Sequence, residues 1–262
     1  MAVITLTTDF GMTDWFVGTM KGVILAINPR AHIVDLAHDV PAGDIRAGAF
    51  ILAAAYRFFP KGTIHLAVID PGVGSRRRIL AVQTKSFVFV GPDNGVLSPA
   101  LAGERVQAVY QVTNAKFFLK PVSQTFHGRD VFAPIAAHLS AGVPIQNLGP
   151  PIREFLRLDW PTPRIGQNEA DGEILYIDRF GNAITNIAER ALSAFDPTRC
   201  EVRLKRKRLC PVCSSYQAVP AGKPVAVFGS SGFLEIAVNG GSAARSFHLK
   251  IGAPVTVRQR GH

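Results

Sequence analysis

Two hydrophobic periodicities alternate over the first 70 residues of the chain. Short apolar runs predict buried strands, and apolar residues that recur every three or four positions predict helices. The apolar runs cover 2–8, 33–36 and 65–69, and the helical spacing covers 16–27 and 45–56. Asn28-Pro29 and Pro60 are expected to end the two helices, because proline cannot donate the backbone hydrogen bond of a helix. This strand–helix order is typical of a doubly wound, mainly parallel α/β sheet.

Further along, the pattern predicts two more strands and a third helix. The strands cover 79–82 and 87–90, and a turn-rich loop follows at 91–95. A helix is expected over 128–139, with Pro134 either distorting it or marking a late start. At the first helix, Thr13 or Asp14 is placed to cap the N-terminus.

The second half of the chain has a different character. Prolines cluster between 142 and 170, which makes this stretch the best linker candidate. Beyond it, short strand-like pieces separated by Gly, Asn and Ser turns predict a smaller all-β, barrel-like domain. These pieces cover 172–178, 183–187, 201–205, 224–228, 233–238 and 254–258. We therefore expect an N-terminal α/β domain over 1–155, a linker over 156–170 and a C-terminal domain over 171–262.

Composition changes this picture little. With 47% apolar and 18% charged residues over 262 positions, the chain has the material for ordinary globular cores. It contains no run of ~18 apolar residues, and its first residues lack the basic start of a secretory signal. Three cysteines, an odd number, fit a reducing compartment better than a disulfide framework. A cytoplasmic protein without a membrane segment is expected.

The net charge of +10 raises the question of an anionic partner. The densest basic run, Lys205-Arg206-Lys207-Arg208, is short and has no interleaved aromatic residues. We interpret it as a solvated strand end or hairpin and expect no nucleic-acid partner. Cys200, Cys210 and Cys213 provide three thiols, one fewer than a structural zinc site requires. A partner His or an intersubunit pair is the alternative that would complete such a site, but we expect unliganded thiols and no metal.

Candidate chemistry begins at the predicted strand ends, where ligands bind in open α/β sheets. Asp70 follows the strand at 65–69, and Arg77 returns a positive charge across a Pro-Gly-x-Gly turn. The simpler alternative is a tight turn with a surface ion pair. Asp9 and Asp14 flank the first strand–helix turn, where a carboxylate can accept both hydroxyls of a ribose. A turn residue and a helix cap are the simpler roles there, and no Gly-x-Gly-x-x-Gly motif supports a dinucleotide site.

Three further polar stretches lie at turns. His127 leads into the helix predicted at 128–139, a position where a histidine is otherwise structural. Phe180 offers a ring for stacking and Asn182 an amide for reading a base edge, although a hairpin turn explains the same sequence. The loop at 229–235 supplies hydroxyls and backbone N–H groups that could hold a carboxylate.

Together these motifs resemble one family, the S-adenosyl-L-methionine (SAM) hydroxide adenosyltransferases or SAM hydrolases, which are related to the SAM-dependent fluorinase and chlorinase. The resemblance runs through nearly the whole chain. Any one motif is weak, but six in this order are specific: T-T-D-F-G, D-P-G-V-G-S-x-R, G-P-D-N-G, F-H-G-R-D, D-x-F-G-N and G-S-S-G-F-L-E-I-A-V-N.

The resemblance implies an α/β domain followed by a barrel-like domain. It also implies a homotrimer, with each site between the N-terminal domain of one subunit and the C-terminal domain of its neighbour. By motif, Asp70, Arg77 and His127 correspond to a water-handling catalytic triad. The implied substrate contacts are Asp9 for the ribose, Asp14, Asp178 and Ser230 for the methionine end, and Phe180, Asn182 and Tyr216 for adenine. Ser231 and Gly43 stand where the halogenases carry Arg and Trp.

The implied reaction is SAM plus water giving adenosine and L-methionine, without a metal or redox cofactor. The sulfonium makes the leaving group a neutral thioether, so the enzyme needs to hold and activate water rather than protonate a leaving group. Halogenation at the same C5′ carbon is the main rival. The halogenases carry Tyr at the position of Asp70, because a carboxylate beside a halide is unfavourable in a low dielectric. Two further rivals are a non-catalytic SAM or nucleoside sensor and, from charge alone, a nucleic-acid-binding protein.

Overall fold

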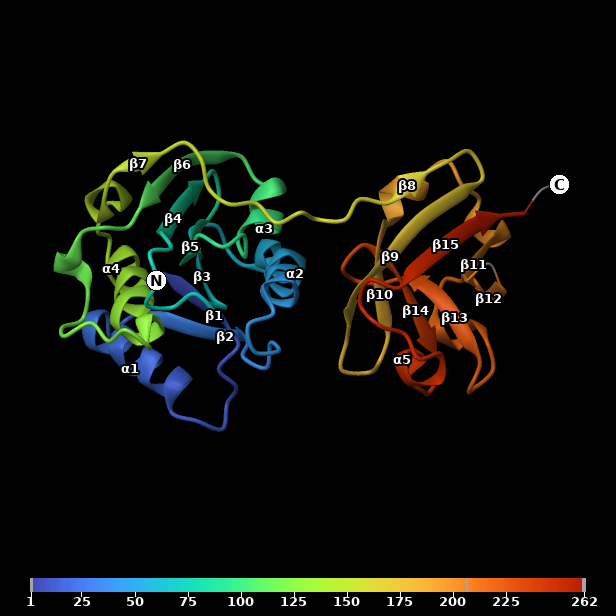
Figure 1. Cartoon of the computed structure of the whole chain (residues 1–262), viewed down its shortest axis with the longest axis horizontal. Helices are drawn as coiled ribbons and strands as arrows, with labels where there is room; N and C mark the ends of the chain where they lie inside the picture. Colours follow the sequence, from blue (N-terminus) through green and yellow to red (C-terminus); the bar gives the residue numbers. More distant parts are fainter. Residues whose placement is uncertain (1, 206, 261–262) are drawn as a thin grey trace. The chain divides into compact units, whose positions relative to one another are not determined.

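The computed structural model describes residues 2–205 and 207–260, and it divides into two compact units, 1–159 and 160–262 (Figure 1). The N-terminal unit is an α/β sandwich and the C-terminal unit is almost entirely β. The helices within the described residues are all too short or too polar to cross a membrane.

The N-terminal unit is built on one seven-stranded sheet of order β2-β1-β3-β5-β4-β6-β7. Its strands are β1 (Val3–Thr8), β2 (His32–Ala37), β3 (Ile64–Val68), β4 (Ile79–Thr84), β5 (Val88–Pro92), β6 (Val106–Gln111) and β7 (Pro151–Ile152). The neighbours among β2, β1, β3 and β5 pair in parallel. The pairs that involve β4, β6 or β7 are antiparallel. The predicted parallel sheet is therefore confirmed, with an antiparallel extension at one side.

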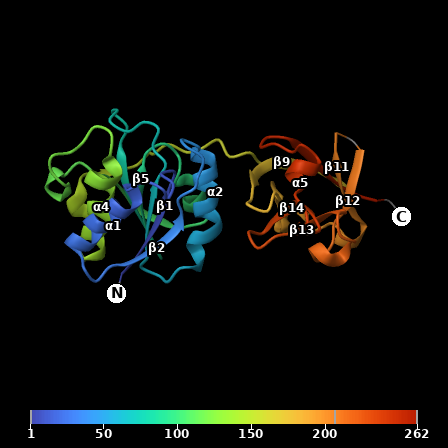
Figure 2. The ribbon, with the colours of Figure 1, turned by 90° about the horizontal axis from the view of Figure 1, so that it is seen from below.

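Helices cover both faces of this sheet, as expected for a doubly wound unit. They are α1 (Phe16–Ile27), α2 (Ile45–Ala55), α3 (Ser98–Ala102) and α4 (Ala133–Ser140), with a π-helical turn, η3 (Gly128–Phe132), directly before α4. The helices α1 and α4 pack together, as do α2 and α3. Figure 2 shows α1 and α4 on one side of the sheet and α2 on the other. The α1–α4 side is closed by fully buried apolar residues of β1, β3 and α1, including Ile4, Leu6, Leu66, Met20 and Ile24.

Two helix starts test the predictions made from capping residues and proline. The first was wrong: Trp15 occupies the N-cap of α1 and makes no side-chain capping bond, so neither Thr13 nor Asp14 caps it. Asp14 is exposed instead. At α4, Pro134 lies in the first turn and marks a late start after the π-turn, because the missing N–H of proline is tolerated only there.

The C-terminal unit is an antiparallel sheet that nearly closes into a barrel. Its strands are β8 (Arg164–Ile165), β9 (Glu169–Ile177), β10 (Ala183–Ala188), β11 (Cys200–Leu204), β12 (Lys207–Pro211), β13 (Pro224–Phe228), β14 (Phe233–Val238) and β15 (Pro254–Gln259). The order is β12-β11-β15-β9-β10-β14-β13, with β8 paired to β9. A bridge between Val212 and Ala226 brings the two outer strands together. The predicted barrel-like class is confirmed.

Short helical turns and one hairpin complete the two units. The turns are η1 (Tyr56–Phe58), η2 (Ala115–Phe117), η4 (Ile145–Leu148), η5 (Glu189–Leu192), η6 (Pro197–Arg199) and η7 (Tyr216–Ala218), and α5 spans Ala243–Ser246. The hairpin expected at the basic run is formed by β11 and β12. Arg206, in the middle of that run, lies outside the described residues.

One histidine lies fully inside the N-terminal unit. His65 on β3 has no exposed surface, and its Nδ1 lies 2.8 Å from the Thr5 hydroxyl. The ring is surrounded by the aromatic rings of Tyr56, Phe87 and Phe89, and its Nε2 has no hydrogen-bond partner among the described residues. Burial lowers the pKa of His65 to about 4, so the fold accepts only the neutral ring.

We expect His65 to make the N-terminal unit sensitive to acid. Its pKa is near 6.5 when unfolded and about 4 when folded, so its contribution is complete above pH 6.5 and is lost as pH falls toward 4. By linkage the loss approaches ~3 kcal/mol. Urea unfolding at a series of pH values should therefore show a shallower acid loss for His65→Phe than for wild type. His32→Gln, a change at an exposed position on β2, is the control. Equal acid losses for His65→Phe and wild type would contradict this account.

Candidate active site

Two carboxylates stand at neighbouring strand ends of the N-terminal sheet. Asp9 directly follows β1, and Asp70 follows β3 after the buried Ile69. The two strands are parallel, with Thr8 opposite Val68. Both carboxylates therefore lie at the same edge of the sheet, where open α/β folds bind their ligands.

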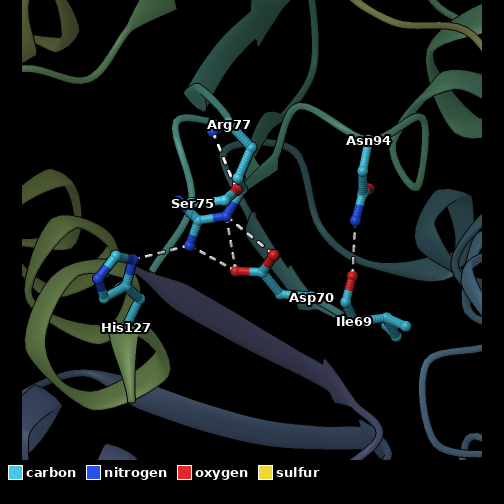
Figure 3. A network of polar contacts seen from close by, with 6 residues as sticks. All are labelled: Ile69, Asp70, Ser75, Arg77, Asn94 and His127. Carbon is cyan, nitrogen blue, oxygen red and sulfur yellow. Dashed lines mark hydrogen bonds and ion pairs between the residues drawn. The ribbon is translucent and has the colours of Figure 1, made fainter. Parts of the chain in front are cut away.

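Asp70, Arg77 and His127 form a connected group at this edge. The Arg77 Nε lies 2.8 Å from both carboxylate oxygens of Asp70, and its Nη2 lies 2.5 Å from Oδ2. The same Nη2 lies 2.8 Å from Nδ1 of His127. Figure 3 shows the guanidinium between the carboxylate and the imidazole. The structure thus brings the three residues of the predicted triad together.

This group is sheltered from solvent. The side chains of Asp70 and Arg77 are only 5% and 10% exposed, and the guanidinium lies over the Phe132 ring, 5.5 Å from its centre. Burial lowers the pKa of His127, and the Arg77 charge lowers it further against the opposing effects of Asp70 and Asp130. Because Arg77 can only donate, the neutral His127 accepts at Nδ1 and carries its proton on Nε2.

The G-P-D-N-G motif supports the triad without joining it. Asn94 donates from Nδ2 to the carbonyl of Ile69 at 2.8 Å, directly before Asp70 (Figure 3). Asp93 is buried, pairs with Arg78 at 2.5 Å and accepts from the backbone N–H of Leu156 at 2.7 Å. The motif therefore fixes the backbone on which the catalytic candidate is carried.

The F-H-G-R-D motif likewise contains one residue of the candidate triad, His127, and residues that hold its turn in place. A Cβ on Gly128 would lie 3.0 Å from the Phe10 ring, so glycine allows η3 to approach the loop after β1. Asp130 is fully buried, pairs with Arg129 at 2.6 Å and accepts from the Ser123 N–H at 2.8 Å. These contacts hold the turn that presents His127.

Asp9 and Asp14 have different surroundings. Asp9 is partly buried, and its Oδ2 accepts from the backbone N–H of Gly43 at 2.8 Å. Gly43 has φ +72°, a conformation that favours glycine, so the residue found where the halogenases carry Trp suits this contact. Asp14 is exposed in the loop before α1, and no contact among the described residues joins it to the triad.

In the C-terminal unit, Asp178 organises the turn between β9 and β10. Its Oδ1 accepts from the N–H groups of Phe180 at 2.9 Å and Asn182 at 2.8 Å, and its Oδ2 accepts from the Asn182 side chain at 3.0 Å. Gly181 in this turn has φ +83°. The Phe180 ring is 76% exposed. The hairpin turn considered from the sequence is therefore present, and it carries a solvent-exposed aromatic ring.

A buried carboxylate that the sequence motifs did not single out lies next to this turn. Glu235 on β14 is 5% exposed and accepts a short hydrogen bond from the Tyr216 hydroxyl. Burial raises the pKa of Glu235 and the nearby charge of Asp178 raises it further, although the Tyr216 bond opposes this. A single acidic residue inside the apolar strand Phe233–Val238 was the available signal.

The loop between β13 and β14 packs on this carboxylate. A Cβ on Gly229 would lie 2.3 Å from Oε2 of Glu235. Ser230 is exposed, whereas the Ser231 hydroxyl is buried and has no partner among the described residues. Asp178, Phe180, Asn182 and Tyr216 are thus linked through turn contacts and Glu235, and Ser230 lies on the adjoining loop.

The cysteines form no recognisable metal site. Cys200, Cys210 and Cys213 are free thiols, and burial raises the pKa of Cys210 to about 12. Within 2–205 and 207–260, no cluster of three His, Cys, Asp or Glu side chains could hold a metal ion.

Comparison with known families agrees with this geometry. Residues 4–149 match the SAM hydroxide adenosyltransferase N-terminal domain, and residues 172–256 match the C-terminal domain of the same family. The chain belongs to the SAM hydroxide adenosyltransferase family. The resemblance inferred from the six motifs is therefore confirmed.

Several members and relatives of the family align over nearly the whole chain. The (R)-S-adenosyl-L-methionine hydrolase of Thermus thermophilus is 39% identical, covering 97% of this chain and 99% of its own. The enzyme of the same name from Methanocaldococcus jannaschii is 35% identical over 89% of this chain and 87% of its own. A fluorinase from an Actinoplanes species is 29% identical, covering 97% of each chain.

A solved structure supports the fold. An uncharacterized conserved protein from Thermotoga maritima superposes with a TM-score of 0.93 at 36% identity, covering 98% of this chain and all of its own.

A glycine in the D-x-F-G-N motif should be intolerant of substitution. A Cβ on Gly181 would lie 2.0 Å from the Ser242 hydroxyl and 3.2 Å from its Cα, in addition to the strain at φ +83°. Gly181→Ala should lower the free energy of unfolding of the C-terminal unit by roughly 3 kcal/mol. Gly222 has a similar φ of +77° but no atom within 4 Å of an added Cβ, so Gly222→Ala should cost about 1 kcal/mol. Equal losses in urea titrations would contradict the proposed clash.

Proposed function

We propose that this protein is a SAM hydrolase that cleaves SAM at C5′ with water, giving adenosine and L-methionine. The observation that carries the proposal is the Asp70–Arg77–His127 group at the carboxyl edge of the parallel strands. The substrate is assigned the R configuration at sulfur that the names of the hydrolase relatives give.

The chemistry asks little of the leaving group. Methionine departs from the sulfonium as a neutral thioether, so no general acid is needed. The enzyme must instead place water in line with the C5′–S bond and accept a proton as the new C–O bond forms. A sheltered carboxylate beside a fixed imidazole has the right properties for both tasks.

Asp70 is the proton acceptor in this proposal. Its two oxygens offer about four acceptor positions, and the Arg77 guanidinium occupies one on Oδ1 and two on Oδ2. Oδ1 therefore retains a free lone pair for the O–H of the attacking water. The guanidinium fixes the direction of that lone pair.

His127 positions the same water by donating to it. Its Nδ1 is occupied by the Arg77 N–H, so its remaining hydrogen is on Nε2. A neutral donor there can hold one lone pair of the water oxygen while the other attacks carbon. His127 thus orients the nucleophile, and Asp70 receives the proton.

The remaining contacts follow the family pattern. Asp9 holds the ribose hydroxyls, and Asp14, Asp178 and Ser230 bind the methionine end. Phe180, Asn182 and Tyr216 bind adenine. The exposed Phe180 ring and the organised turn around Asp178 support these roles.

The proposed assembly is a homotrimer in which neighbouring subunits complete each site. Large apolar side chains on both units support it: Met12, Trp15 and Phe180 are 57%, 70% and 76% exposed. Apolar side chains exposed beside a proposed site are candidates for cover by a neighbouring subunit. The proposed location is the cytoplasm, and no nucleic-acid or membrane partner is proposed.

Removal of the Asp70 carboxylate should stop turnover while leaving binding intact. Asp70→Asn keeps the shape but loses the proton acceptor, and a drop in kcat of roughly 10²–10⁴-fold is expected. Adenosine and methionine formed from SAM are measured by chromatography and mass spectrometry, and SAM binding by calorimetry. Glu154→Gln, at an exposed position, serves as control. Turnover retained in Asp70→Asn would contradict the assignment.

Incubation of wild type with SAM and excess chloride or fluoride separates hydrolysis from halogenation. Only adenosine is expected, because a carboxylate at the attacking position disfavours a halide. A 5′-halo-5′-deoxyadenosine product would establish the rival reaction. Binding of SAM without any adenosine after long incubation would instead indicate a sensor.

The pH dependence should reflect the depressed pKa of His127. Burial, followed by the Arg77 charge, lowers the pKa of His127 from its usual value of 6.5, so the ring stays neutral to lower pH. Protonation would turn Nδ1 from an acceptor into a donor that faces the Arg77 N–H. We expect the acid-side midpoint of kcat/KM to lie below pH 6.5, and kcat/KM to fall about tenfold per unit beneath that midpoint. The His127 ring signals in NMR should titrate with the same midpoint. A midpoint at or above 6.5 would contradict the neutral-donor role.

A further inference from the structure

We propose that His38 is a positioning residue for ribose recognition, acting by holding the Asp9 carboxylate in the direction of the 2′- and 3′-hydroxyls. This inference rests on the proposed function, which assigns Asp9 to the ribose. His38 lies just after β2, the edge strand beside β1, and its side chain is buried.

The turn that carries Asp9 is tied to His38 on both sides. Before Asp9, the Thr8 hydroxyl lies 2.8 Å from Nδ1 of His38. After Asp9, the backbone N–H of Gly11 donates to the carbonyl of His38 at 2.9 Å. The Thr8 oxygen also accepts from the Phe10 N–H at 3.4 Å. One residue therefore fixes the backbone on each side of the carboxylate.

The imidazole is itself held from the surface. Its Nε2 lies 2.9 Å from Oδ1 of Asp35, and Oδ2 of Asp35 accepts from Lys21 at 2.5 Å. Burial raises the pKa of Asp35, but its bonds to Lys21 and His38 more than offset this and lower it overall. An ionised Asp35 accepts from Nε2–H, which leaves Nδ1 to accept from Thr8.

The segment after His38 completes the frame. It leads to Gly43, whose N–H donates to Oδ2 of Asp9 at 2.8 Å. Carboxylate position and backbone position are thus set by the same loop between β2 and α2. The free lone pairs of Asp9 are left for a diol, which needs two acceptors at a defined angle. If the Asp9 carboxylate were held less firmly, its charged hydrogen bonds to the diol would weaken before the other ligand contacts.

The test compares adenosine with 2′,3′-dideoxyadenosine, because only the first offers hydroxyls to Asp9. Calorimetric affinities of both are measured for wild type, His38→Gln, Asp9→Asn and His138→Gln. The last is a matched change at a partly buried histidine of α4. We expect His38→Gln to weaken adenosine about tenfold and dideoxyadenosine less than twofold, following Asp9→Asn. His138→Gln should change neither affinity.

Some outcomes contradict the role of His38, and others concern only the proposed function. Equal weakening of both nucleosides, or of neither, overturns the role of His38, since a merely structural defect does not distinguish them. If His38→Gln fails to fold, Thr8→Val removes the same link and is judged by the same ratio. SAM hydrolysis by wild type is assayed in parallel. If wild type does not hydrolyse SAM but the two nucleosides are weakened in the expected ratio, only the proposed function is refuted. If wild type hydrolyses SAM but that ratio is not found, only the role of His38 is refuted.

Discussion

The guanidinium of Arg77 is the group on which the geometry of the site depends. It contacts both oxygens of Asp70 and Nδ1 of His127, so two segments 50 residues apart meet on one rigid plane. An arginine remains charged at any pH that the fold tolerates. Its side chain is nearly buried and stacks on Phe132, which restricts its rotamers. Lysine would supply the charge without the fork, so the relation between carboxylate and imidazole would be lost.

The scaffold brings this plane to the right place through the ends of parallel strands. Asp9, Asp70 and Asn94 each follow one of the adjacent strands β1, β3 and β5. Within the motifs, only some residues carry chemistry. Asp93 and Asp130 are buried, and they pair with neighbouring arginines and accept hydrogen bonds from backbone N–H groups. The motif sequences therefore encode the supports of the candidate site together with the groups proposed to react.

Local patterns were sufficient for most of the elements, although they missed α3 and β6, and for the pair formed across a seven-residue turn, Asp70 and Arg77. His127 joined them only through the family resemblance, because no periodicity shows which distant turn meets which strand end. The antiparallel pairing of β4 with β6 likewise depends on contacts between segments distant in sequence, whereas β4 and β5 form a local hairpin. The cap predicted at Thr13 or Asp14 was wrong because α1 begins at Phe16, which places Trp15 at the N-cap. Glu235 was missed because a buried acid in a strand has meaning only beside its partner Tyr216.

The net charge of +10 conflicts with a cationic substrate only if all charges act equally. At physiological salt, exposed charges are screened over about 8 Å, so much of the basic surface has little effect inside a sheltered site. Buried carboxylates are screened far less. Asp70 is neutralised by its own arginine, whereas burial, and to a smaller extent the nearby charge of Asp178, raises the pKa of Glu235 against the opposing Tyr216 bond. Two acidic side chains, Asp178 and Glu235, therefore lie close together among the predicted substrate contacts of the C-terminal unit. An ionised carboxylate beside a ligand favours a sulfonium or ammonium group and disfavours an anion, whatever the sign of the whole molecule.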